Sequence, residues 1–150
     1  MALVGVVLGS KTDASLVQPA IDMLEKLGVE HEVAVISAHR NPAKVREYGL
    51  KAEKKGLEVI IAAAGYAAHL PGVLASWTTL PVIGVPLPTS DLKGIDSLLS
   101  IIQMPPGVPV ACVGINGARN AALLAARILG IKYDRIKQAC NEYAARLAEE

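Results

Sequence analysis

Residues 32–42, Glu-Val-Ala-Val-Ile-Ser-Ala-His-Arg-Asn-Pro, join an apolar run, a polar loop and a helix start. The run Glu32–Ile36 has the length and β-branched content of a strand. Pro42 suits the first turn of a helix, where its missing N–H would be unpaired in any case. Between the two lie a hydroxyl, an imidazole and a guanidinium, from Ser37, His39 and Arg40. The stretch predicts a strand–loop–helix unit whose loop carries chemistry.

The same unit recurs along the chain. Further apolar runs occur at Leu3–Leu8, Val59–Ala63, Val82–Val85 and Val110–Val113. They are continuous rather than alternating, as is typical of strands covered on both faces. Helical patterns lie at Ala14–Leu27, Pro42–Lys55, Ala67–Trp77, Gly94–Met104, Arg119–Leu129 and Tyr133–Ala148. This order predicts an α/β fold in a single domain, 1–150: a three-layer flavodoxin-like sandwich with a five-stranded parallel sheet and an extra C-terminal helix.

Charge and cysteine usage narrow the class of protein. The 15 basic and 14 acidic residues nearly cancel, so neither nucleic acid nor an anionic membrane is an expected partner. Cys112 and Cys140 lack metal-ligand spacing and are typical of reduced core residues in a cytoplasmic protein. No apolar stretch reaches the roughly 18 residues of a membrane span, and no basic leader opens the chain.

The apolar content predicts self-association. Hydrophobic residues make up 52% of this short chain, which has no phenylalanine. The stretch Ala121–Ala126 is small or apolar on every face of a helix. Such a helix is buried all round, and we expect neighbouring subunits of a homo-oligomer to bury it.

In sheets of this kind, ligands bind beyond the carboxyl ends of the strands. The loops expected at that edge contain two of the three histidines and many of the hydroxyls. They are residues 9–13, 37–41, 64–72, 86–93 and 114–117. His31 opens a strand at the opposite edge and is expected to be plain surface. The loop at 86–93 is long enough to act as a lid.

The first loop, Gly-Ser-Lys-Thr-Asp at 9–13, has two interpretations. Ser10 and Asp13 have the spacing of a capping box, which is purely structural. A Gly–Ser turn at a helix start also offers N–H groups and a hydroxyl to a phosphate, while Asp13 would suit ribose hydroxyls. The two roles can coexist.

The second and third loops carry the histidines. The imidazole of His39 suits proton transfer in both directions, and Arg40 offers a planar fork to phosphate. Residues 62–72 are almost bare of side chains, so the backbone can wrap closely around a small ligand. Alternatively, His39 is a solvated loop residue and 62–72 a tight turn, with His69 bonded to backbone. A zinc site from His39, His69 and Asp13 fits by residue type only, so no metal is predicted.

Taken in order, the stretches GSKTD, SAHRNP, AGYAAHLPG, LPVIGVP, GIDSLLSIIQMPPGVPV and NAALLAARIL span nearly the whole chain. They resemble the N5-carboxyaminoimidazole ribonucleotide mutase family of purine biosynthesis, also called the catalytic subunit of phosphoribosylaminoimidazole carboxylase. The resemblance implies a homo-octamer with active sites between subunits. It implies a ribonucleotide substrate and an isomerase that moves a carboxyl group from N5 to C4 without a cofactor.

The resemblance also implies residue roles. Ser10, Asp13 and Arg40 hold the ribose phosphate, with support from Ser37. His39 carries the proton. The wall of the imidazole and CO2 pocket consists of Gly65, Ala67, Ala68, His69 and Leu70, and His69 is counted with His39 as catalytic because AHLPG is typical of the mutase branch. Family members usually have glycine where this chain has Tyr66, whose ring could roof the pocket or fold outward.

Two other functions stay open. One is a carboxylase that acts on aminoimidazole ribonucleotide with free CO2. The other is a flavodoxin-like module that binds a nucleotide without chemistry. Flavin binding is disfavoured because aromatic residues are only 3% of the chain. A dinucleotide-dependent dehydrogenase is disfavoured because no G-x-G-x-x-G follows the first strand.

Overall fold

A five-stranded parallel sheet forms the centre of the computed structural model, which describes residues 1–150. The strand order is β2-β1-β3-β4-β5, and all four pairings are parallel. The strands are β1 (Val4–Leu8), β2 (His31–Val35), β3 (Val59–Ala64), β4 (Val82–Pro86) and β5 (Ala111–Cys112). This is the flavodoxin-like order, so the predicted fold class is confirmed.

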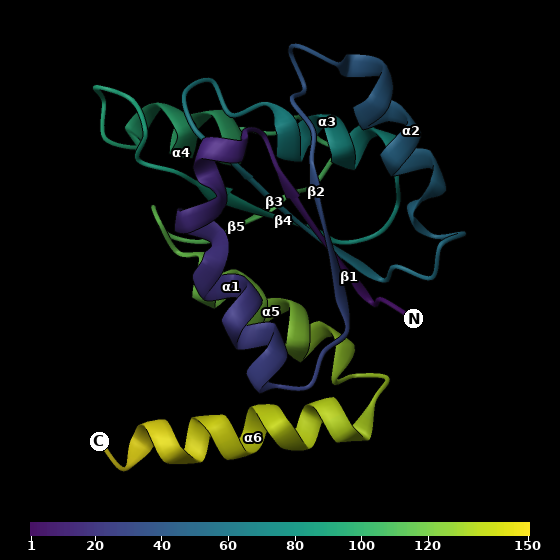
Figure 1. The fold of residues 1–150 in the computed structure, drawn as a ribbon, viewed down its shortest axis with the longest axis vertical. Helices are drawn as coiled ribbons and strands as arrows, with labels where there is room; N and C mark the ends of the chain where they lie inside the picture. Colours follow the sequence, from purple (N-terminus) through teal and green to yellow (C-terminus); the bar gives the residue numbers. More distant parts are fainter.

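Helices cover both faces of the sheet (Figure 1). They are α1 (Ala14–Lys26), α2 (Pro42–Ala52), α3 (Leu70–Trp77), α4 (Ile95–Ile102), α5 (Ala118–Leu129) and α6 (Asp134–Ala148). The α1 and α5 helices lie on one face, and α2, α3 and α4 lie on the other. The last helix, α6, lies outside the α1–α5 layer and contacts α5. Each helix is too short or too polar to cross a membrane.

The continuous apolar runs follow from this layering. In β1, Val6 and Leu8 belong to the core shared with α1 and α5, whereas Val7 belongs to the core shared with α2 and α3. The central strands therefore need apolar residues at every position. The edge strand β2 is the exception, because the side chains of Val33 and Val35 are exposed in the single chain.

Most predicted boundaries differ from the structure by one to three residues, and three elements illustrate the differences. The fifth strand shrinks to two residues. The second helix ends at Ala52 rather than Lys55, in a turn where Gly56 has a φ of 95°. The third helix starts at Leu70 rather than Ala67, because Tyr66 takes a left-handed backbone conformation and Ala67 lies in the bend that follows.

The expectation for the alanine-rich helix is wrong. Residues Ala121, Ala122, Ala125 and Ala126 are buried, but by the chain's own α1, α6 and sheet. Small side chains let α5 fit between these layers. The exposed apolar side chains near the fourth helix instead form an α4 row, which we define as Leu92, Ile95, Leu99 and Ile102.

Two smaller expectations also change. His31 is half-buried, and its Nδ1–H donates to the Val29 carbonyl oxygen at 3.1 Å, so it is a satisfied strand residue rather than plain surface. The two cysteines are free, as expected, but half-buried at the margins of the core. Burial raises the pKa of both thiols.

Candidate functional site

The first four post-strand loops meet at the carboxyl edge of the sheet and enclose a cavity of about 390 Å³. The loop after β5 does not line it. The lining residues are Gly9, Ser10, Thr12, Asp13, Ser37, Ala38, His39, Arg40, Ala64, Gly65, Tyr66, Ala67, His69, Leu70 and Thr89. All but one of the predicted site residues thus lie around one space.

His39 and His69 are joined by a hydrogen bond inside this cavity. The His39 Nε2 and His69 Nδ1 atoms lie 2.8 Å apart, and the two rings meet edge to face at 84°. His69 stands directly before α3, yet its side chain makes no capping bond to the helix. The structural alternative for His69, a bond to backbone, is therefore wrong. One nitrogen donates and the other accepts, so a proton can pass between the rings.

The loop after β2 places Arg40 at the cavity and leaves its guanidinium without an acidic partner. The Arg40 backbone N–H donates to Ser37 Oγ at 3.2 Å, and Asn41 caps α2 by accepting the Lys44 N–H. These two bonds fix the turn that ends at Pro42. The Arg40 side chain takes part in none of the ion pairs of the chain, so its donors are available to an anion.

The loop after β1 combines capping with a buried acid. Ser10 Oγ accepts the Thr12 N–H at 3.3 Å and lies 2.9 Å from the Thr12 hydroxyl. Ser10 thus caps the short 3-10 turn at Lys11–Asp13 through Thr12 rather than through Asp13. Asp13 is only 5% exposed, and burial raises the pKa of its carboxyl, offset in part by a backbone hydrogen bond at Ser10.

The wall after β3 is built from small residues, as expected, with one correction. Gly65, Ala67 and Leu70 line the cavity, but Ala68 does not. Ala68 is 1% exposed and belongs to the core shared with α2 and α3.

Sequence reasoning missed Thr89 as an individual site residue. It lies in the 86–93 loop, whose first residue ends β4 and whose Leu87 is fully buried. A Cβ added at Gly65 would overlap Thr89 Oγ1, so the third and fourth loops are in close contact at this point. The available signal was a hydroxyl side chain in a loop expected at the carboxyl edge of the sheet.

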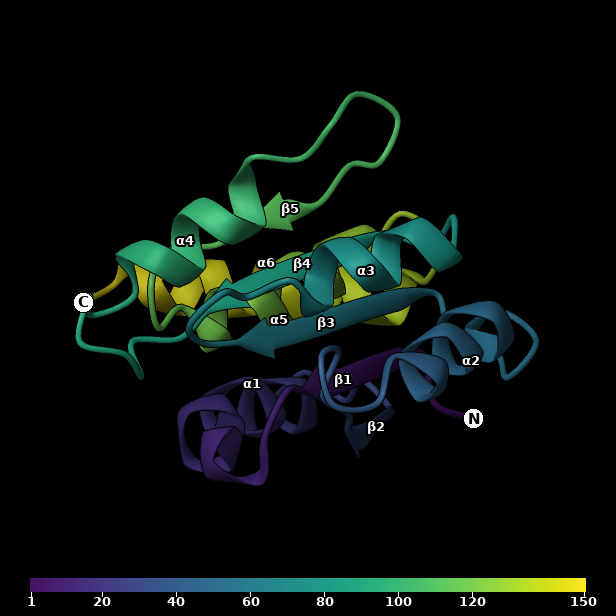
Figure 2. The ribbon, with the colours of Figure 1, turned by 90° about the horizontal axis from the view of Figure 1, so that it is seen from above.

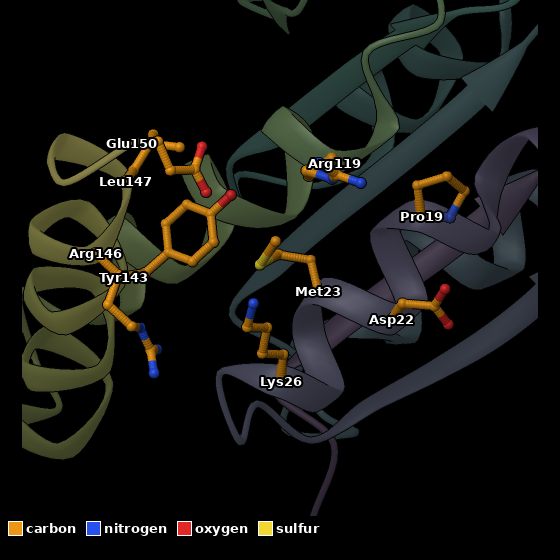
Figure 3. A pocket seen from close by; sticks show the side chains of 9 residues that line it. All are labelled: Pro19, Asp22, Met23, Lys26, Arg119, Tyr143, Arg146, Leu147 and Glu150. Carbon is orange, nitrogen blue, oxygen red and sulfur yellow. The ribbon is translucent and has the colours of Figure 1, made fainter.

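A larger hollow of about 490 Å³ lies elsewhere, between α1, the start of α5 and α6 (Figure 3). Its charged residues are of both signs, with Lys26, Arg119 and Arg146 beside Asp22 and Glu150. It contains no histidine, and the Lys26 ammonium lies 5.4 Å from the Tyr143 ring centre. No group of three or more metal-ligating side chains occurs in the chain. The proton-transfer groups are concentrated at the sheet edge.

Comparison with known proteins gives one consistent family. The sequence model described as AIR carboxylase matches residues 3–150. The N5-carboxyaminoimidazole ribonucleotide mutase of Thermotoga maritima is 54% identical over 150 residues, which cover 100% of this chain and 88% of the relative. A chloroplastic phosphoribosylaminoimidazole carboxylase of Vigna aconitifolia is 51% identical over 94% of this chain, which corresponds to 25% of that protein. The crystal structure of Treponema denticola PurE superposes with a TM-score of 0.87 at 28% identity, covering 99% of this chain and 93% of that one.

Proposed function

The chain belongs to the AIR carboxylase family, and we propose that the His39–His69 cavity is where it moves a carboxyl group from N5 to C4 of carboxyaminoimidazole ribonucleotide. This is the mutase reaction of purine biosynthesis for which its close relatives are named. The observation that carries the assignment of the site is the 2.8 Å contact between two imidazoles in a cavity that also holds Arg40.

The chemistry needs one proton that is given and then recovered. Protonation of the carbamate nitrogen breaks its bond to the carboxyl carbon and releases CO2. Carbon 4 of the ring, nucleophilic as in an enamine, then attacks that CO2, and its own proton leaves. His39 gives the first proton and takes the last, so the cycle is proton-neutral. The hydrogen bond between His39 Nε2 and His69 Nδ1 holds the His39 ring in one orientation.

The other residues have binding roles in this proposal. The Arg40 guanidinium takes the phosphate, Ser37 holds the turn that presents Arg40, and Ser10 supports the same phosphate. Asp13 accepts from ribose hydroxyls, which would compensate its burial on binding.

Small wall residues keep the released CO2 against the ring. Gly65 and Ala67 leave a close-fitting surface with little side chain. Replacing a diffusive encounter with an oriented one can lower the barrier by up to about 7–11 kcal/mol. No cofactor is required for any of these steps.

A carboxylase that uses free CO2 is the second candidate, favoured by the 51% identity with the plant protein of that name. The two are separated by offering purified protein either N5-carboxyaminoimidazole ribonucleotide or aminoimidazole ribonucleotide with bicarbonate. The mutase forms the 4-carboxylated product efficiently from the first. Efficient use of the second at low bicarbonate, with no use of the first, would assign the carboxylase.

We further propose a homo-octamer in the cytoplasm whose other partner is the small ribonucleotide. The α4 row supports the first part, because four large apolar side chains near one helix are exposed in the single chain. The two free cysteines support a reducing compartment.

A further inference from the structure

Tyr66 occupies a position that its own backbone disfavours. Its φ is 54°, in the left-handed region, and the residue stands directly after Gly65 in the loop that follows β3. A bulky residue at positive φ is an outlier, whereas glycine adopts this conformation without steric cost. Local geometry therefore favours glycine at position 66, and something else must account for the phenol ring.

Contacts within the chain do not account for the ring. The Tyr66 side chain belongs to neither hydrophobic core, and the residue is 63% exposed. Its hydroxyl makes none of the side-chain hydrogen bonds of the protein. By contrast, the hydroxyls of Tyr48 and Tyr133 donate to Glu32 and Glu58, respectively. Folding thus gains little from Tyr66, although it carries backbone strain.

The ring does border the cavity. Tyr66 lines it together with His39, His69 and Thr89, and it is the only phenol, phenyl or indole ring that does so. The other residues of the loop after β3 that line the cavity are glycine, alanine and one leucine. An exposed flat ring at the rim can bury its apolar faces by closing over a ligand that the cavity holds.

We propose that Tyr66 is a positioning residue that covers the heterocycle of the bound ribonucleotide and retains CO2 between its release and its recapture. The inference rests on the proposed function and deepens it. The bond from N5 to the carboxyl carbon breaks, and the bond from C4 to the same carbon forms. Tyr66 exchanges no proton or electron in either step, and its ring closes the path by which CO2 would leave.

The test measures how CO2 partitions. Protein is given N5-carboxyaminoimidazole ribonucleotide, and the ratio of leaked aminoimidazole ribonucleotide to 4-carboxylated product is followed. Tyr66→Gly should raise this ratio on the order of tenfold. Tyr66→Phe keeps the ring and should restore a low ratio. Because glycine relieves the left-handed strain, Tyr66→Gly should also raise the melting temperature by about 2–4 °C.

The possible outcomes distinguish failure of the Tyr66 proposal from failure of the proposed mutase function. If the unchanged protein does not convert the N5-carboxylated substrate, the proposed function fails. If it does, and Tyr66→Gly releases no more aminoimidazole ribonucleotide than the parent, the proposal that Tyr66 retains CO2 is refuted. A leak as large in Tyr66→Phe as in Tyr66→Gly would also refute it, since the ring would not be the barrier. An altered oligomer size with unchanged partition would assign the ring to a subunit contact and overturn the proposal.

Discussion

A single hydrogen bond between His39 and His69 spans 30 residues of sequence and brings two loops to one point. The β2-β1-β3 order separates the two parent strands by one strand, and both loops emerge at the same edge. At the scale of the residue, the account depends on His39 acting on a bound substrate, and on the ring of His69 setting its orientation.

His39→Asn tests the proton carrier. The variant should lose turnover by at least about 10²-fold, the low end for general acid–base catalysis. Binding of the nucleotide, followed by calorimetry, should remain, because Arg40 and Asp13 are untouched. Near-normal turnover would remove His39 from the mechanism.

Asp13→Asn tests how much the buried carboxyl group of Asp13 destabilises the folded protein when it is ionised. The folded-state pKa of Asp13 is raised above its ordinary value of 3.8 because the carboxyl is buried. A carboxyl group whose pKa is raised by folding stabilises the folded state fully at pH values below its ordinary pKa. This stabilisation is lost as the pH rises through the raised, folded-state pKa. At pH 7, Asp13→Asn should therefore be more stable than the parent in urea.

This gain should shrink as pH falls toward 3.8, where the parent carboxyl also becomes neutral. Asp13→Asn should at the same time bind the nucleotide more weakly, because the amide is a poorer acceptor for ribose hydroxyls. A variant that is less stable than the parent at pH 7 would show that the carboxylate is satisfied in the folded protein.

At the scale of the element, the site is made where loops pack against one another. Ser97, fully buried at the start of α4, has its hydroxyl 3.0 Å from the carbonyl oxygens of Leu87 and Gly94. This contact ties the β4–α4 loop to its helix. Thr89 in the same loop then contacts Gly65 of the preceding one.

Gly65→Ala tests that contact. The added Cβ would overlap Thr89 Oγ1, so the Thr89 side chain or its loop must shift, at a cost of about 1–3 kcal/mol for overpacking. Turnover and substrate binding should both fall, and Thr89→Ala in the same chain should restore part of each. Gly114→Ala is the matched control in another post-strand loop, because a Cβ there meets nothing within 4 Å. Equal losses in the two single variants would contradict the packing argument.

The sequence predicted the elements well where periodicity is strong. All five apolar runs contain strands, and the three central ones are apolar throughout because helices cover the sheet on both faces. Boundaries were less accurate, because Tyr66 at positive φ and Gly56 end or delay helices in ways that a pattern does not register. The inward direction of Ala68 was also beyond the pattern, since it depends on how the loop leaves β3.

At the level of the whole molecule, the alanine-rich helix α5 is buried within its own chain rather than by a neighbouring subunit. A helix that is apolar on every face must be buried, but the sequence does not show which element buries it. Here α6 covers part of α5, and Figure 2 shows both helices on the same side of the sheet. Exposed apolar side chains are grouped in the α4 row and on the edge strand β2, whereas others, such as Leu50 and Ile131, are scattered over the surface. The hydrogen bond between the histidines likewise needed the strand order, which no local pattern contains.

The oligomer is tested by light scattering. The protein should scatter as an assembly of about eight chains of 15.7 kDa each. Leu99→Glu places a charge in the α4 row, 51% exposed in the single chain, and should shift the population to smaller species. A monomer at micromolar concentration in the unchanged protein would contradict the octamer.

The central claim is that the carboxyl group is transferred within one substrate molecule held in the His39–His69 cavity. N5-carboxyaminoimidazole ribonucleotide labelled with carbon-13 in its carboxyl group is supplied in a solution of unlabelled bicarbonate, and the 4-carboxylated product is analysed by mass spectrometry. Most of the product is expected to carry the label, because CO2 is recaptured before it escapes. Product that carries mainly unlabelled carboxyl, at the isotope ratio of the bicarbonate pool, would contradict this claim.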